Sequence, residues 1–159
     1  MTTIIDATNL IVGRMASYIA KKAILGEEFI IINAEKAIIT GNKTQILARF
    51  RRFREMGTPF QGPFTPKRSK DILKRTIRGM LPYKNYKGKE AFKRIKCFNG
   101  TPKNLKGEPT TLEHANVSKV PNTRFITLKR VSEFLGAKPS PTSAKVTELS
   151  SGTPKQSFD

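Results

Sequence analysis

The sequence predicts a single α/β domain, because its first third holds a strand, a helix and a strand in succession. The β-branched residues 2–5 are typical of a strand. Apolar residues then recur at helical spacing from Val12 to Ala23, which predicts a helix over about residues 13–25 with Gly26 at its end. The unbroken apolar run 29–32 is typical of a strand buried on both faces, as in a parallel sheet. Together these elements form a βαβ unit, for which a right-handed crossover is expected.

Length and composition are those of one modest domain. The chain has 159 residues, about the size of one domain, and its hydrophobic fraction of 37% predicts a small core. The single cysteine, Cys97, excludes an internal disulfide and a multi-cysteine zinc site. The N-terminus lacks the pattern of a secretory leader, and no apolar run approaches the roughly 18 residues of a membrane-spanning helix. We therefore expect an intracellular, cytoplasmic protein.

Nearly all of the positive charge lies in the middle of the chain. Residues 43–106 contain 19 Lys and Arg against three acidic residues, a net charge of +16, whereas the whole chain carries +18. Such asymmetry indicates a polyanionic partner for this basic segment, and a pI of about 10.4 makes nucleic acid the leading candidate. An anionic membrane surface is less favoured, because the cations are spread over several elements instead of one amphipathic helix.

Two basic helices separated by a loop are predicted within this segment. Residues 37–40 form an apolar strand or turn, and Asn42 or Thr40 is expected to cap a helix over residues 43–55. Residues 57–68, rich in Gly and Pro, predict a loop with extended segments. A second helix is expected to begin with Ser69 as its N-cap and to end before Pro82, which cannot continue the helical hydrogen bonds.

The rest of the chain, from residue 85, is predicted to contain shorter elements separated by loops. We expect a polar turn at 85–89, a short helix at 90–94, a strand at 95–98, a loop at 101–113 and a late helix at 127–135 ended by Gly136. From residue 137 the chain is rich in Ser, Thr, Pro and Lys. The predicted organisation is therefore a domain over 1–136 and a tail over 137–159 that is disordered unless a partner holds it.

Aromatic residues alternate with the cations of the basic segment. Cations neutralise phosphates, and exposed rings can stack on unpaired bases, although Phe50, Phe53 and Phe92 on helices are expected to face the core. No zinc-finger, homeodomain, basic-zipper or RNP-type motif is visible. Because cations occur both on helices and on a Gly/Pro-rich loop, the pattern favours an irregular folded RNA over a DNA groove.

Other functions have weaker support. Gly13 opens a helix but belongs to no GxGxxG motif, which disfavours a dinucleotide site, and neither a Cys97–His114 pair nor a cofactor is predicted. A metal-dependent nuclease would need clustered carboxylates, and the candidates are Asp6, Glu27, Glu28 and Glu35. Glu27 and Glu28 are typical of a solvated turn, and Asp6 of a turn at the end of a strand. Loss of metal-dependent RNA cleavage in Asp6→Asn or Glu35→Gln would identify that rival. A general nucleic-acid-coating protein would instead bind duplex DNA as well as folded RNA.

Five blocks in the same order resemble the universal large-subunit ribosomal protein L-thirteen family. They are residues 5–9 with 12–17, 32–36, 40–43 and 78–82, and residues 57–68, 82–84 and 87–95 resemble its archaeal and eukaryotic branch. The resemblance covers about residues 3–102. It implies a three-layer α/β/α domain with a small, mainly parallel four-stranded sheet, binding to large-subunit ribosomal RNA beside neighbouring ribosomal proteins, and a role in early subunit assembly. It implies no catalysis, metal or small-molecule substrate.

Charge and resemblance together predict the residues that lie against RNA. Gly79 is included because glycine permits close backbone approach, so a bulky residue there should harm folding or docking, whereas Met80 and Leu81 are expected to pack inward. The predicted RNA-binding residues are Lys43, Arg49, Arg51, Arg52, Arg54, Lys67, Arg68, Lys70, Lys74, Arg75, Arg78, Gly79, Lys84, Lys87, Lys89, Lys93 and Arg94.

Overall fold

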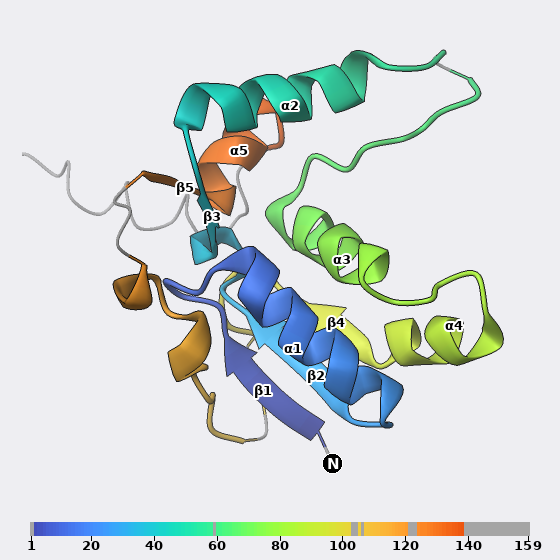
Figure 1. Cartoon of the computed structure of the whole chain (residues 1–159), viewed down its shortest axis with the longest axis vertical. Coiled ribbons are helices and arrows are strands. Elements are labelled where there is room, and N and C mark those ends of the chain that lie inside the picture. Colours follow the sequence, from blue (N-terminus) through green and yellow to red (C-terminus); the bar gives the residue numbers. More distant parts are fainter. Residues whose placement is uncertain (1, 59, 103–104, 106, 121–123, 139–159) are drawn as a thin grey trace, which may run out of the picture.

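The larger sheet in the described part of the chain has three parallel strands. The computed structural model describes residues 2–58, 60–102, 105, 107–120 and 124–138. Strands β1 (Thr2–Asp6), β2 (Glu28–Ile32) and β4 (Ile95–Cys97) lie side by side in the order β1-β2-β4, all parallel. Helix α1 (Val12–Ile24) joins β1 to β2 (Figure 1). The predicted βαβ unit is therefore confirmed.

A separate two-stranded sheet joins distant parts of the chain. Strand β3 (Ile38–Thr40) pairs antiparallel with β5 (Phe125–Thr127), which the sequence did not predict as a strand. Within the described residues, the single four-stranded sheet of the resemblance is not confirmed. Thr110 forms only an isolated parallel bridge to Ile5 on the free edge of β1.

Helices cover one face of the parallel sheet. Helices α3 (Ser69–Gly79) and α4 (Tyr86–Lys93) both contact α1 and β4. Their apolar residues complete a core in which Phe29 and Ile31 are fully buried, whereas Ile30 is half-buried. The three-layer arrangement thus stays a prediction.

Helix α2 (Lys43–Glu55) is the least buried helix of the described fold. None of its residues is buried, and it contacts α5 (Leu128–Phe134) beside the main body (Figure 1). Its N-terminus is capped as expected, because the Asn42 side chain accepts a hydrogen bond from the Thr44 backbone N–H at 3.1 Å. Short 3-10 turns occupy Ala34–Lys36, Glu113–Ala115 and Val117–Lys119.

Three local predictions are corrected. Ser69 is the first residue of α3 and not its N-cap, which is Arg68; its buried hydroxyl donates to the Leu128 carbonyl at 3.3 Å instead. Met80 is 42% exposed, although Leu81 packs inward as expected. Helix α4 begins at Tyr86, within the predicted polar turn 85–89.

The predicted tail over 137–159 lies outside the described residues, apart from residues 137 and 138.

Candidate nucleic-acid interface

The basic segment folds into consecutive elements along one side of the molecule. Figure 1 shows α2, the 57–68 loop, α3 and α4 following one another there. Five of the predicted RNA-binding side chains are half-buried, namely Lys70, Lys74, Arg75, Arg78 and Arg94. The other predicted residues are exposed: Lys43, Arg49, Arg51, Arg52, Arg54, Lys67, Arg68, Gly79, Lys84, Lys87, Lys89 and Lys93.

On α2, two arginines are engaged within the protein. Arg51 donates to the Glu55 carboxylate at 2.7 Å, and this hydrogen bond raises the pKa of Arg51. Arg54 donates through Nη1 to the Leu135 carbonyl oxygen at 2.6 Å, which ties α2 to the end of α5. Arg54 therefore holds the helix in place as well as contributing positive charge.

The loop between α2 and α3 presents aromatic side chains to solvent. A backbone bridge joins Thr58 to Gly62, and a Cβ at Gly57 would overlap the Gly62 carbonyl oxygen, so only glycine fits there. Phe60 and Phe64 are 95% and 73% exposed. Such rings beside cations are suited to stacking on unpaired bases.

Side chains from both neighbouring helices hold this loop. The Thr65 hydroxyl donates to the Phe53 carbonyl at 3.1 Å, and Arg75 Nη1 donates to the Phe64 carbonyl at 2.7 Å. Arg75 thus has a structural role that its spacing on the basic face of α3 did not reveal.

Helix α3 is amphipathic, with Ile72, Leu73 and Ile77 buried. Two of its cations lie over aromatic rings: Lys74 Nζ is 4.8 Å from the Phe92 ring centroid, and the Arg78 guanidinium carbon is 5.1 Å from that of Tyr83. Such cation–π contacts orient the charged groups while leaving them able to donate to phosphates.

Helix α4 packs closely against the turn after α3. A Cβ at Gly88 would overlap the carbonyl group of Pro82, whereas one at Gly79 would meet no atom within 4 Å. Within the protein, the glycine required for close backbone approach is therefore Gly88, which sequence analysis missed, and not Gly79. No local signal distinguished the two.

At the end of α4, the remaining cations differ in their engagement. The exposed Lys93 pairs with the half-buried Glu90 carboxylate at 2.9 Å, which raises the pKa of Lys93. Arg94 is half-buried and donates to the Ala23 carbonyl at 3.3 Å, joining α4 to the end of α1. A guanidinium has five N–H donors, so Arg94 retains others for a phosphate.

Aromatic residues on the basic helices divide between core and surface. Phe50 and Phe92 are half-buried and pack against the core, in line with their predicted orientation. Phe53 is 41% exposed, so its predicted core position is wrong. Tyr86, at the start of α4, is 79% exposed.

The carboxylate of Asp6, one of the candidate nuclease residues, is held by hydrogen bonds within the protein. One Asp6 carboxylate oxygen accepts from the Asn33 side-chain amide at 3.0 Å and from the Thr8 backbone N–H and hydroxyl. Burial acts to raise the pKa of Asp6, but these hydrogen bonds outweigh it, and the pKa lies below its ordinary value. Asp6 therefore joins the ends of β1 and β2.

Cys97 and His114, the other side chains considered for catalysis, also have contacts and burial that suit a structural role. Burial raises the pKa of the Cys97 thiol to about 12, which opposes formation of a thiolate nucleophile. The His114 ring packs against Tyr18, with centroids 5.2 Å apart. Across the described ranges, no three His, Cys, Asp or Glu side chains gather in a group that could hold a metal ion.

No helix in the described part of the chain combines the length and the apolarity that crossing a membrane requires.

Comparison with known proteins extends the similarity beyond the basic segment. The sequence model of the family described as "Ribosomal protein L13" matches residues 1–104. The large ribosomal subunit protein uL13 of Methanocaldococcus jannaschii is 48% identical over 140 residues, which cover 86% of this chain and 98% of that protein. The protein of the same name from Methanosarcina barkeri is 46% identical over 138 residues, covering 86% and 99%.

A third relative gives the same result. The large ribosomal subunit protein uL13 of Archaeoglobus fulgidus is 42% identical over 136 residues, covering 84% of this chain and 87% of that protein. Alignments of this length continue past residue 104, beyond the resemblance that the sequence showed over about residues 3–102. The family match and these identities over most of the chain show that this chain belongs to the ribosomal protein L13 family.

Proposed function

We propose that this protein is a structural component of the large ribosomal subunit, that it binds large-subunit ribosomal RNA, and that it supports early subunit assembly. The observation that carries the proposal is that residues 43–106 have a net charge of +16 and that twelve of the seventeen predicted RNA-binding residues, on α2, α3, α4 and the loops beside them, are exposed. Family membership supports the ribosomal setting. The role is structural, and its place is the ribosome in the cytoplasm.

The geometry explains how a small domain would hold an irregular RNA. The core formed by β1, β2, β4, α1 and α3 anchors the basic elements, while α2 stands beside the body with all its cations exposed. Phosphates from several RNA segments would meet α2, the loop, α3 and α4 in turn, and each neutralised phosphate releases counterions. The seventeen residues named above are the proposed contacts, within one domain over 1–136 and beside neighbouring ribosomal proteins.

Salt dependence of binding tests the proposed surface. Large-subunit ribosomal RNA is titrated with the full-length protein over a range of salt concentrations. Lys87→Gln, on the exposed face of α4, should weaken binding and reduce the salt slope by about 1. Lys21→Gln makes the same change on the exposed surface of α1, outside the basic segment, and should leave the slope unchanged.

The same titration separates the proposal from its main rival. A duplex DNA of matched length and charge should bind more weakly than the ribosomal RNA at every salt concentration. Equal affinity for both would favour a general nucleic-acid-coating protein, and equal slopes for the two lysine variants would remove α4 from the interface.

A further inference from the structure

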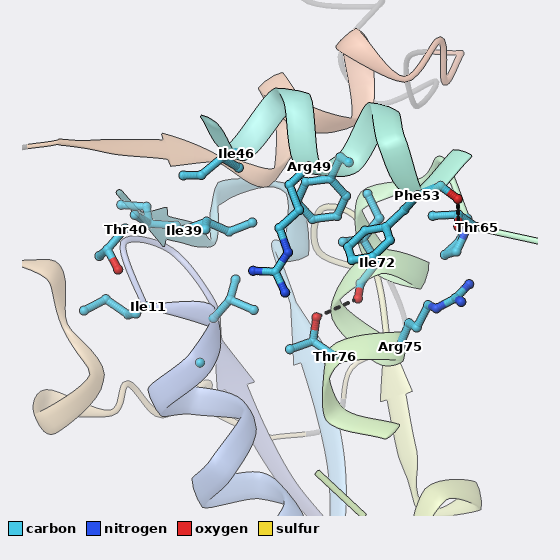
Figure 2. Close-up of a pocket in the computed structure, with 15 residues that line it drawn as sticks. Ile11, Ile39, Thr40, Ile46, Arg49, Phe53, Thr65, Ile72, Arg75 and Thr76 are labelled. Carbon is cyan, nitrogen blue, oxygen red and sulfur yellow. Dashed lines mark hydrogen bonds between the residues drawn. The ribbon is translucent and has the colours of Figure 1, made fainter. Parts of the chain in front are cut away.

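A cleft separates α2 from the rest of the domain. It has a volume of about 520 Å³ and lies between α2, the start of α1, β3 and α3 (Figure 2). Pockets of roughly 300–1,000 Å³ are large enough to enclose a compact ligand or several side chains of a partner. The walls include Ile39 and Ile72 from the body and Ile46 and Phe53 from α2.

The cleft exists because α2 leaves its apolar side incompletely covered. Ile46 is only half-buried and Phe53 is 41% exposed, although both face this cleft. Aliphatic and aromatic groups left in contact with water on an otherwise cationic helix indicate a surface that another molecule covers.

An arginine without a polar partner lies in the middle of this apolar surface. Figure 2 shows Arg49 pointing from α2 into the cleft, with its guanidinium carbon 5.5 Å from the centroid of the Phe53 ring. Among the described residues, Arg49 makes no hydrogen bond or ion pair, and neither Asp nor Glu lines the cleft. A guanidinium beside apolar groups gains most from a carboxylate or phosphate that pairs with two of its donors.

The polar groups of the walls favour a carboxylate carried by a protein segment over a nucleotide. The hydroxyls of Thr65 and Thr76 already donate to the carbonyls of Phe53 and Ile72, at 3.1 Å each. The inner walls are otherwise largely aliphatic, so the polar edge of an inserted base would lose its hydrogen bonds with water and find few in return. An apolar side chain has no such cost.

We propose that the cleft between α2 and α3 binds a protein segment that places an apolar side chain between α2 and the body and a neighbouring Asp or Glu carboxylate on Arg49. The inference rests on the proposed function only in placing the protein among neighbouring proteins in the large subunit. It revises one of the seventeen proposed RNA contacts: Arg49 pairs with a protein carboxylate, and the other sixteen stay against RNA.

Photo-crosslinking in assembled large subunits tests this occupant. The photoreactive residue p-benzoyl-phenylalanine replaces Phe53, which lines the cleft, and in a separate variant replaces Tyr86, at the start of α4. We expect the position-53 probe to crosslink to a protein segment in which an Asp or Glu lies beside an apolar residue. A crosslink from position 53 to RNA, no crosslink, or a crosslink to a segment without such an acid would overturn the inference.

Charge reversal then tests the role of Arg49. Arg49→Glu should lower the yield of the position-53 crosslink about tenfold or more, since a buried interfacial charge pair is lost. Lys21→Glu is the control, because Lys21 is exposed on α1, does not line the cleft and is not among the proposed RNA contacts. An equal effect of both substitutions, or of neither, would show that no carboxylate pairs with Arg49.

The Tyr86 probe separates this inference from the proposed function. A crosslink from position 86 to ribosomal RNA supports the proposed RNA-binding surface, whatever position 53 does. If position 86 crosslinks RNA and position 53 finds no acidic protein segment, the cleft inference alone fails. If position 86 finds no RNA, the proposed role of α4 fails, and the cleft is judged on position 53 by itself.

Discussion

Two helical glycines in the basic segment should respond in opposite ways to the same substitution. Gly88 lies in α4 and Gly79 ends α3. In both cases the added atom is one methyl group, and in a free helix alanine is more favourable than glycine by about 1 kcal/mol. At Gly79 the new Cβ meets no atom within 4 Å, so Gly79→Ala should be neutral or stabilising by up to about 1 kcal/mol.

At Gly88 the surroundings reverse this gain. The Cβ would overlap the Pro82 carbonyl group and lie 2.9 Å from the Tyr83 backbone nitrogen. These neighbours are backbone atoms, so the turn between α3 and α4 must move. Overpacking of this kind costs about 1–3 kcal/mol. The free energy of unfolding of Gly88→Ala should therefore lie about 1–3 kcal/mol below that of Gly79→Ala.

Thermal unfolding of the two full-length variants, followed by circular dichroism beside the unsubstituted protein, measures this difference. For a domain of this size, about 1 kcal/mol corresponds to roughly 2–4 °C, so Gly88→Ala should melt about 2–12 °C below Gly79→Ala. Equal melting temperatures, or a higher one for Gly88→Ala, would refute the close approach of α4 to Pro82. A marked loss of stability in Gly79→Ala would show that the space beside Gly79 is not open.

Two further substitutions test contacts that connect distant parts of the chain. Arg54→Met removes the hydrogen bond to the Leu135 carbonyl and should lower the free energy of unfolding, measured in urea, by about 1–3 kcal/mol. Arg52→Met, on the exposed surface of the same helix, is the control and should be nearly neutral. Equal effects of the two substitutions would contradict the structural role of Arg54. The folded pKa of Asp6 lies below the ordinary 3.8, so its ionised carboxylate stabilises the fold above that pH, and this contribution is lost as pH falls through the folded value. Asp6→Asn should accordingly reduce the loss of unfolding free energy between about pH 5 and about pH 2, and an unchanged pH profile would contradict this coupling.

Local patterns in the sequence were sufficient to predict several helices and strands. Apolar spacing predicted α1 and the helix over 43–55, and the run 29–32 predicted β2, because hydrophobic periodicity reports which side of an element is buried. Asn42 was recognisable as a cap from its chemistry alone. The charge count located the whole candidate interface, since net charge does not depend on how the chain folds.

Other features depend on residues far apart in the chain. Strand β5 has only three residues and is defined by its pairing with β3, a partner that no local pattern names. For the same reason, Ser69 was taken for a helix cap, although its hydroxyl is directed to Leu128 by the packing of α3 on α5.

The sequence by itself determined the fold class, the order of most helices and strands, and the position of the positive charge, because these follow from periodicity and composition. Only the tertiary structure decided which cations also hold the fold together. Arg54 reaches a carbonyl 81 residues away and Arg94 one 71 residues away, and such pairings depend on chain geometry, not on residue type. The cleft beside Arg49 is likewise a product of how α2 packs, since its walls come from four separate elements.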